Sequence, residues 1–341
     1  MTRWWILPLA VGVLSRVYSI GLIALLPSAT PVLKRFVTWD GGWYLGVAQL
    51  GYHARPIGYG TNGPQHDFAF FPGWPMTIRL GSFGFIPMPV VAAVLANILF
   101  VVAIVVLYRV FAARYHGAAL LGVTLLAFSP AAYVFSMAYS ESLFLLLVAL
   151  LFACRAPLGR PILAAAATFT RSAGLALLAP AAVELWRGRP RRAVGLGLGV
   201  AAGLGAWSLF VWQLTGDPLS WLHESVGWSP DRGFAAVALV IRHPDAVKIT
   251  RLAFAVLILC ATALSALRDL ELGSYSFAEV AMTMLAGTVY SAPRFALLGI
   301  SAFPELAARL RGRRALVLLV IFALAQAFFV LTVFGSAQKE P

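Results

Sequence analysis

Apolar runs that could cross a membrane recur along nearly the whole chain, and they limit the possible folds more than any other feature. A membrane-spanning helix needs about 20 mostly apolar residues. Candidate spans cover residues 4–26, 88–111, 118–136, 139–155, 193–213, 248–267, 275–291, 295–309 and 315–335. Of the 341 residues, 61% are hydrophobic and 11% are charged, whereas soluble domains carry about 25% charged residues. The sequence therefore predicts an all-α, polytopic membrane protein.

The arginines in short connections predict which side of the membrane each loop faces. Basic connections occur at Arg109–Arg114, Arg155–Arg160, Arg187–Arg192 and Arg309–Arg314. Cytoplasmic loops carry an excess of lysine and arginine, so we place all four in the cytoplasm. The run at 161–186 begins and ends beside two of them, so it must enter the membrane and return. We therefore predict two short helices that meet near Arg171, and about eleven spans in all.

Two longer segments lie on the extracytoplasmic side in this arrangement, residues 27–87 and 214–247. The first is too long to be a simple connection, and structureless loops of such length are usually functional. No fixed-period repeat and no low-complexity linker divides the chain. We expect residues 1–341 to form a single transmembrane domain in the cell membrane, with interfacial helices in the first loop.

Charge and cysteine content narrow the possible partners. The net charge is +13, but the basic residues lie mostly in short membrane-flanking connections. They are therefore expected to meet anionic lipid headgroups and not nucleic acid.

Cys154 and Cys260 both lie in apolar runs, without the spacing of zinc ligands. We expect no disulfide framework, no metal and no cofactor.

Ionisable residues from four separated segments converge on the extracytoplasmic side in this topology. They are Asp40, His53, Arg55, His66 and Asp67 in the first loop, Glu141 after Tyr139, and the isolated Arg171 and Arg294. Each could be an ordinary loop charge, but their coincidence on one face is harder to dismiss. Arg171 and Arg294 are flanked by apolar sequence, so each requires a carboxylate or phosphate partner. Glu141 is a candidate partner for one of them, and a lipid phosphate for the other.

Two segments of the first loop have more than one interpretation. Asp40 opens a stretch, residues 40–52, whose pattern is typical of an amphipathic helix at the interface. Asp40 either caps this helix or is a carboxylate held above the membrane as a general base. The aromatic segment 68–75 either belongs to an interfacial belt, or it grips a lipid chain or lines a cavity. The adjacent pair His66 and Asp67 could bind a substrate hydroxyl or phosphate.

Five motifs, in the same order along the chain, resemble those of the PIG-V-like mannosyltransferases, a family of GT-C membrane glycosyltransferases. They are WDGGWY at 39–44 followed by GY at 51–52, FAFFPGWP at 68–75, SPAA at 129–132 followed by YSESLF at 139–144, TRSAG at 170–174, and SAPRF at 291–295. The resemblance extends from about residue 36 to residue 310. Trp74, Ser140 and Phe295 replace residues usual in the family, while the charged positions are intact. These replacements leave the identity of the acceptor open.

The resemblance implies a GT-C-like architecture and an inverting transfer of mannose at the extracytoplasmic face. The donor would be polyprenyl-phosphate-mannose, and the acceptor a glycolipid or lipoglycan. Asp40 would be the catalytic base, and Arg294 and Arg171 would bind the donor phosphate. The candidate substrate-binding residues are Trp39, Trp43, Tyr44, His53, His66, Asp67, Tyr139 and Glu141. Arginine can neutralise a leaving phosphate without a metal ion, and the sequence contains no DxD motif.

The sequence leaves three alternative functions to be considered. A transporter or lipid flippase would also use broken helices and intramembrane arginines, although here the ionisable groups gather at one face and not at the midplane. An intramembrane hydrolase would need a nucleophile segment such as GxSxG, which the sequence lacks. The third is a noncatalytic scaffold of a cell-envelope complex.

Overall fold

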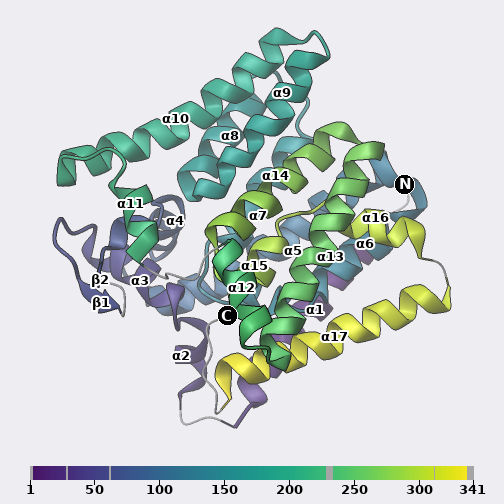
Figure 1. Ribbon diagram of the computed structural model, residues 1–341, viewed down its shortest axis with the longest axis horizontal. Helices are drawn as coiled ribbons and strands as arrows, with labels where there is room; N and C mark the ends of the chain where they lie inside the picture. Colours follow the sequence, from purple (N-terminus) through teal and green to yellow (C-terminus); the bar gives the residue numbers. More distant parts are fainter. Residues whose placement is uncertain (1–2, 28–29, 61–62, 228–232, 311, 336–341) are drawn as a thin grey trace.

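The computed structural model describes residues 3–27, 30–60, 63–227, 233–310 and 312–335, and nearly all of its regular structure is helical (Figure 1). The long helices are α1 (Ile6–Leu25), α5 (Met88–Tyr115), α10 (Pro190–Thr215), α13 (Ala246–Arg268) and α17 (Arg313–Phe334). The shorter bundle helices are α6 (Ala119–Ala127), α7 (Glu141–Ala153), α8 (Gly159–Thr170), α9 (Leu178–Trp186), α14 (Leu270–Ala286) and α16 (Ala302–Arg309). The predicted all-α class is confirmed.

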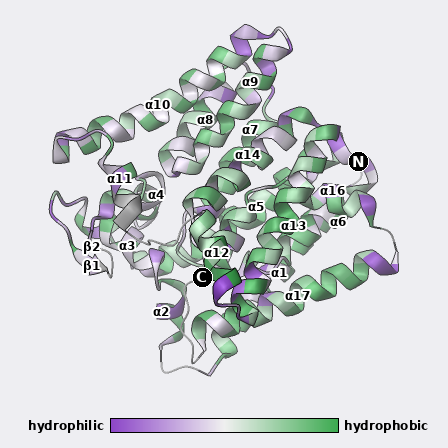
Figure 2. Ribbon diagram, in the orientation of Figure 1, coloured by the Kyte–Doolittle hydropathy of each residue, from purple (hydrophilic) through white to green (hydrophobic). Residues whose placement is uncertain are grey.

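Five helical stretches in the described part of the chain are long and apolar enough to cross a membrane. They are α1, α5 with its continuation α6, α10, α13 and α17. Apolar residues also cover their outward faces (Figure 2), for example the exposed Leu14, Val17, Leu198 and Leu324. The predicted count of about eleven spans stays a prediction, because the other apolar runs are divided among shorter helices.

A proline divides one of these runs. The predicted span 118–136 forms α6 and then a 3₁₀ helix, η3 (Ala132–Ser136), because Pro130 has no N–H and disfavours helical backbone just before it. Arg16, buried in α1, donates hydrogen bonds to the Ala132 carbonyl at 2.9 Å and to Ser136 Oγ at 3.0 Å. Irregular backbone within a membrane protein is tolerated when other protein groups satisfy it in this way.

The run at 161–186 forms two short helices that meet at Arg171, as predicted. Arg171 is extended, with φ −156° and ψ 145°, and separates α8 from the 3₁₀ helix η4 (Ser172–Leu177) and α9. A Cβ on Gly199 of α10 would meet the Pro161 carbonyl, and one on Gly203 would meet the Ala165 carbonyl. Helix α8 therefore runs alongside α10 in the same direction, and α9 returns to the start of α10.

Two glycines allow the backbone to pack closely at this turn. A Cβ on Gly174 would lie 2.5 Å from Thr168 Cα, so the chain can fold back across the end of α8 only with glycine there. A Cβ on Gly73, at the start of α4 (Gly73–Gly81), would lie 2.3 Å from Thr170 Oγ1. The first loop and the residue before Arg171 are thus in direct contact.

We expect the substitution Gly73→Ala to lower the melting temperature of the purified protein, because its methyl group would also lie 2.8 Å from Thr170 Cα. Overpacking of this kind costs about 1–3 kcal/mol. Thermal unfolding in detergent measures the effect. The matched control is Gly46→Ala in α3 (Asp40–Leu50), where nothing lies within 4 Å of the new Cβ and alanine favours the helix. An equal melting temperature for the two variants would contradict the close contact.

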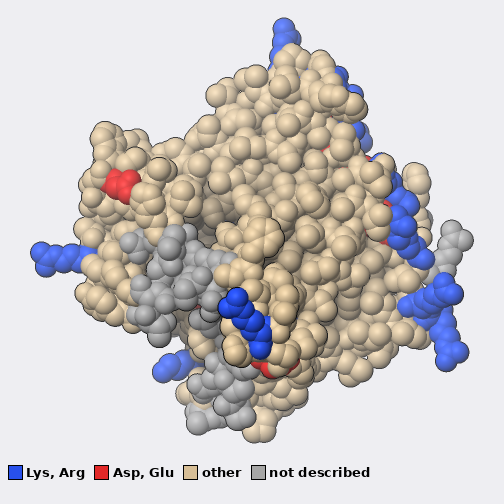
Figure 3. All heavy atoms as spheres, viewed as in Figure 1, with Lys and Arg blue, Asp and Glu red and all other residues tan. Residues whose placement is uncertain are grey.

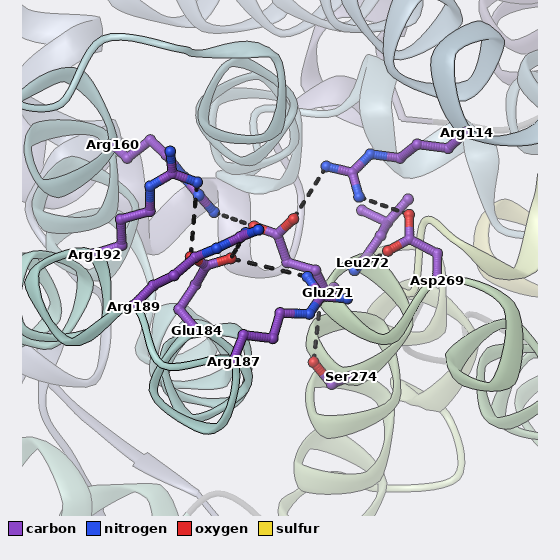
Figure 4. Close-up of polar contacts among 10 residues, drawn as sticks. All are labelled: Arg114, Arg160, Glu184, Arg187, Arg189, Arg192, Asp269, Glu271, Leu272 and Ser274. Carbon is purple, nitrogen blue, oxygen red and sulfur yellow. Dashed lines mark hydrogen bonds and ion pairs between the residues drawn. The ribbon is translucent and has the colours of Figure 1, made fainter.

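The four basic connections lie together at one end of the bundle. Figure 4 shows arginines of three connections around Glu184 and Glu271, with Arg114 bonded to Asp269 at 2.6 Å and Arg160 paired with Glu271. Glu305 joins the fourth connection, because it pairs with Arg309 at 2.8 Å and with Arg268 at 3.2 Å. Figure 3 shows lysine and arginine side chains along the right-hand edge, on the side where Figure 1 places the N-terminus.

The loop elements lie at the other end. Helices α10 and α14 both begin at the basic end and lead away from it (Figure 1). The elements at the far end are α2 (Val32–Phe36), α3, the antiparallel strands β1 (Gly58–Gly60) and β2 (Gly63–Gln65), η1 (Asp67–Ala69), α4, α11 (Ser220–Gly227), α12 (Phe234–Arg242) and α15 (Ala292–Ala296). This end therefore holds the first loop and the turn that carries Arg294.

Candidate active site

Asp40 is the first residue of α3, but its side chain does not cap that helix. Trp39 precedes it with φ +57°, a left-handed conformation that is strained for a tryptophan. No side-chain hydrogen bond caps the helix. Instead, Asp40 Oδ2 lies 2.6 Å from Arg294 Nη1, and the Asp40 side chain is 27% exposed. The capping interpretation of Asp40 is therefore wrong, and its carboxylate is available at the surface of the site.

Arg294 lies in the five-residue helix α15 and faces two carboxylates. Its Nη1 contacts Asp40, and its Nε lies 3.8 Å from Glu141 Oε1. Burial alone would lower the pKa of Arg294, but the charges of Asp40 and Glu141 outweigh this and raise it above its ordinary value. The residue is therefore a permanent cation in the site.

Glu141 and Arg171 continue the row of alternating charges. Arg171 Nη1 lies 2.9 Å from Glu141 Oε1 and donates a hydrogen bond to Ser140 Oγ at 2.8 Å. Glu141 is only 1% exposed. The order Arg171, Glu141, Arg294, Asp40 thus joins four segments of the sequence. Glu141, a candidate partner for one of the two arginines, lies beside both of them.

Aromatic side chains surround the two guanidinium groups. Arg294 Cζ lies 5.3 Å from the Tyr139 ring centre and 4.8 Å from that of Phe295, and Arg171 Cζ lies 5.4 Å from Phe295. Tyr44 reaches the site through Ser140, at 2.8 Å between the two hydroxyl oxygens. Burial raises the pKa of Tyr44 to about 12, so this hydroxyl keeps its proton. The rings attract the two guanidinium groups through cation–π interactions.

Several buried polar atoms of this cluster have no hydrogen-bond partner. They are both carboxylate oxygens of Glu141, Nε of Arg294 and the hydroxyl of Tyr139. Buried polar groups are nearly always hydrogen-bonded, so each exception requires an explanation. Glu141 Oε1 is ion-paired with Arg171 at 2.9 Å, but neither carboxylate oxygen accepts a hydrogen bond. Such oxygens beside an N–H donor without an acceptor suit a ligand that carries both an anionic oxygen and hydroxyl groups.

The predicted sugar contacts His53, His66 and Asp67 lie elsewhere in the first loop. The buried Asp67 carboxylate accepts from the His53 backbone N–H at 3.1 Å and lies 2.8 Å from His53 Nδ1. His66 stacks on Phe68, with 4.7 Å between ring centres. The contacts described for His53 and Asp67 order the loop, so their role toward a substrate stays a prediction.

Segment 68–75 packs against protein and not against lipid. Phe68, Phe71 and Trp74 are buried, and Trp74 Nε1 donates to the Ala138 carbonyl at 2.9 Å. The residue after Ala138 is Tyr139 of the site. The interpretation of this segment as an interfacial belt is therefore wrong, because its rings support the site from the loop side.

The remaining predicted aromatic residues lie in α3 or next to it. Trp43 stacks on Phe70 at 5.6 Å with an interplanar angle of 8°, and Tyr44 meets the same ring edge-on at 5.1 Å. Trp39, beside Asp40, is 37% exposed. Trp43 thus ties α3 to the aromatic segment, while Trp39 and Tyr44 flank the charged row.

Glu279 is a buried acidic residue that the sequence reasoning missed. It lies in α14, which packs against η4, the segment that directly follows Arg171. Neither of its carboxylate oxygens has a hydrogen-bond partner, nor has the Tyr275 hydroxyl one turn earlier. The sequence does contain a signal for Glu279, because it is an acidic residue inside the apolar run 275–291 and such residues are usually functional.

Among the described residues, no group of three His, Cys, Asp or Glu side chains could hold a metal ion.

The fold is similar to that of two crystal structures of the Archaeoglobus fulgidus oligosaccharyltransferase. The apo form has 13% sequence identity and a TM-score of 0.50, and the match covers 99% of this chain and 56% of that one. The form tethered to an acceptor peptide with the NVT sequon has 12% identity and a TM-score of 0.50, over 100% and 56% of the two chains. This chain thus spans about half the length of those structures, and at such low identity the likeness concerns the fold alone.

The fold is that of a polytopic membrane protein with GT-C-like architecture, as predicted. Within that class, residues 22–179 match the family described as Mannosyltransferase (PIG-V), so the resemblance found in the sequence motifs is confirmed. The matched segment contains Asp40, Glu141 and Arg171, whereas Arg294 lies beyond it. No curated protein matches the sequence.

Proposed function

We propose that the protein is a membrane glycosyltransferase that moves mannose from polyprenyl-phosphate-mannose to a hydroxyl of a glycolipid or lipoglycan on the extracytoplasmic side. The observation that carries this proposal is the row Arg171, Glu141, Arg294 and Asp40, in which several buried polar atoms have no hydrogen-bond partner. A phosphate oxygen would satisfy the Arg294 N–H, and sugar or acceptor hydroxyls would satisfy Glu141 and Tyr139.

The reaction is a single displacement at the anomeric carbon. The acceptor oxygen attacks that carbon while Asp40 takes the hydroxyl proton. The bond from the anomeric carbon to the phosphate oxygen breaks, and its electron pair stays on the phosphate. Attack opposite to the leaving group inverts the configuration. Arg294 and Arg171 neutralise the charge that develops on the phosphate.

The ion pair between Asp40 and Arg294 explains how the net charge around Arg294 stays constant through this step. Before the reaction Arg294 holds the Asp40 carboxylate at 2.6 Å. When Asp40 accepts the proton it loses its negative charge, and the leaving phosphate gains one. Arg294 can therefore exchange one anionic partner for another, so the total charge around it is unchanged.

The test is sugar transfer by the purified protein in lipid vesicles. The vesicles contain a polyprenyl-phosphate-mannose with labelled sugar and a glycolipid extract as acceptor. We expect labelled glycolipid whose new linkage has the opposite anomeric configuration to the donor. Movement of the donor between leaflets without any new glycosidic bond would identify a flippase instead. Retained configuration would exclude Asp40 as the base of a single displacement.

A further inference from the structure

Arg251 is a buried arginine outside the charged row described above. It lies near the start of α13, is 1% exposed, and was not among the residues that the sequence singled out. Arginines buried in a membrane protein are costly to retain and are usually functional. Its contacts indicate what it does.

The guanidinium of Arg251 joins three elements. Its Nη1 donates to the Tyr290 carbonyl at 2.6 Å, and its Nη2 donates to Thr332 Oγ1 of α17 at 3.4 Å. Its Cζ lies 5.4 Å from the Tyr290 ring centre and 5.3 Å from that of Phe329. Arg251 therefore fixes both the backbone and the ring of Tyr290 against α13 and α17.

Tyr290 belongs to the turn that leads directly to Arg294. In this turn the hydroxyl oxygens of Thr288 and Ser291 lie 2.7 Å apart, and the Ser291 N–H donates to Thr288 Oγ1 at 3.2 Å. The Arg294 N–H donates to the Ser291 carbonyl at 3.2 Å. The position of Arg294 is thus coupled to the backbone that Arg251 holds.

Helix α15 cannot hold Arg294 in place by itself. It has five residues, Ala292–Ala296, and isolated helices below about 12 residues are marginal. Its position depends on its packing against α13 and α14 (Figure 1) and on the preceding turn. A misplacement of about 1 Å can reduce a catalysed rate about 100-fold. The contacts by which Arg251 holds this turn therefore matter for any reaction at Arg294.

We propose that Arg251 is a positioning residue, which acts on the reaction through Arg294 by holding the turn at 288–291. The kinetic part of this inference depends on the proposed transferase function, whereas the structural part does not. Two measurements test the parts separately.

The first measurement is hydrogen–deuterium exchange of the wild type and of Arg251→Met, which keeps an apolar stem without the guanidinium. We expect faster exchange of the backbone amides over residues 288–296 in the variant. The matched control is Tyr18→Phe, which removes a different hydrogen bond to a backbone carbonyl, from Tyr18 to Ala323 at 2.7 Å. Unchanged exchange over 288–296 in Arg251→Met would overturn the proposal, even if no sugar transfer were found.

The second measurement is a double-mutant cycle in the vesicle transfer assay. We expect Arg251→Met to lower kcat about tenfold or more while the donor KM changes less, as for an interaction made in the transition state. Arg251→Lys should recover part of the rate, because an ammonium can still reach one acceptor but lacks the planar fork. Combined with Arg294→Gln, Arg251→Met should add no further loss.

A purely structural role for Arg251 would give different results. Its loss would then lower kcat equally in the presence and absence of Arg294, or would reduce only the amount of folded protein. If Arg251→Met does not fold, Thr288→Val removes the hydroxyl that closes the same turn, and the same two measurements apply to it. Independent effects of Arg294→Gln and either variant would overturn the proposal. A wild type without transferase activity would instead reject the proposed function.

Discussion

Replacement of Asp40 by asparagine is expected to reduce the rate of sugar transfer by about 10²–10⁴-fold, the usual contribution of a general base. Asparagine has the shape of aspartate, and its amide oxygen can still accept a hydrogen bond from Arg294. It cannot take a proton from the acceptor hydroxyl. The loss should therefore appear in kcat, measured as the initial rate of labelled glycolipid formation in vesicles.

The control for this variant is Asp217→Asn. Asp217 is also an extracytoplasmic carboxylate in the predicted topology, and it lies 2.8 Å from His223 Nδ1 with 43% of its side chain exposed. It contacts none of the four charged residues of the site in the described structure, so its replacement should leave the rate within about twofold. If Asp40→Asn kept more than about a tenth of the wild-type rate, the assignment of Asp40 as base would be wrong.

Replacement of Arg294 by glutamine should have the second largest effect, a loss of about 10²–10³-fold in kcat. Removal of a single preorganised group that stabilises transition-state charge has effects of this size. Two features of the site add to the expectation. Asp40 would lose its partner at 2.6 Å, and the leaving phosphate would lose the cation that balances its new charge. The same vesicle assay measures the loss.

Arg309→Gln is a matched substitution at the opposite end of the bundle. Arg309 also pairs with a carboxylate, Glu305, at 2.8 Å, but half of its side chain is exposed. The buried Glu305 keeps a second partner, Arg268, at 3.2 Å after this substitution, so we expect near wild-type transfer from this variant. A similar fall in rate for both arginine variants would indicate a general effect of lost ion pairs and would contradict a specific role for Arg294.

The two ion pairs of the site differ in how far the sequence alone could predict them. Glu141 and Arg171 are 30 positions apart, and the sequence already predicted that a guanidinium in apolar surroundings needs a carboxylate or phosphate partner, with Glu141 as a candidate. The pairing of Asp40 with Arg294 spans most of the chain. No local pattern carries that information, because the contact exists only after the first loop and α15 have packed at the same end of the bundle.

For residues whose sequence pattern allowed two interpretations, only the packing in the structure decided between them. A helix was expected from residue 40, and α3 begins at Asp40, but the direction of that carboxylate depends on Arg294. Aromatic residues such as Phe71 and Trp74 suit a lipid interface and a protein interior equally well. Burial against Ala138 decided between these interpretations, and it also explains why the segment lies beside Tyr139.

The sequence by itself determined that the chain resides in a membrane, that the arginines of its four basic connections gather at one end, and that 161–186 folds back at Arg171. These features follow from hydropathy, charge and chain continuity, which are local properties. Only the tertiary structure decided which charges meet, that Glu279 and Arg251 are buried beside the elements of the site, and which helices are long enough to span. Those outcomes depend on contacts between distant segments, whose free energy arises only when the helices pack together.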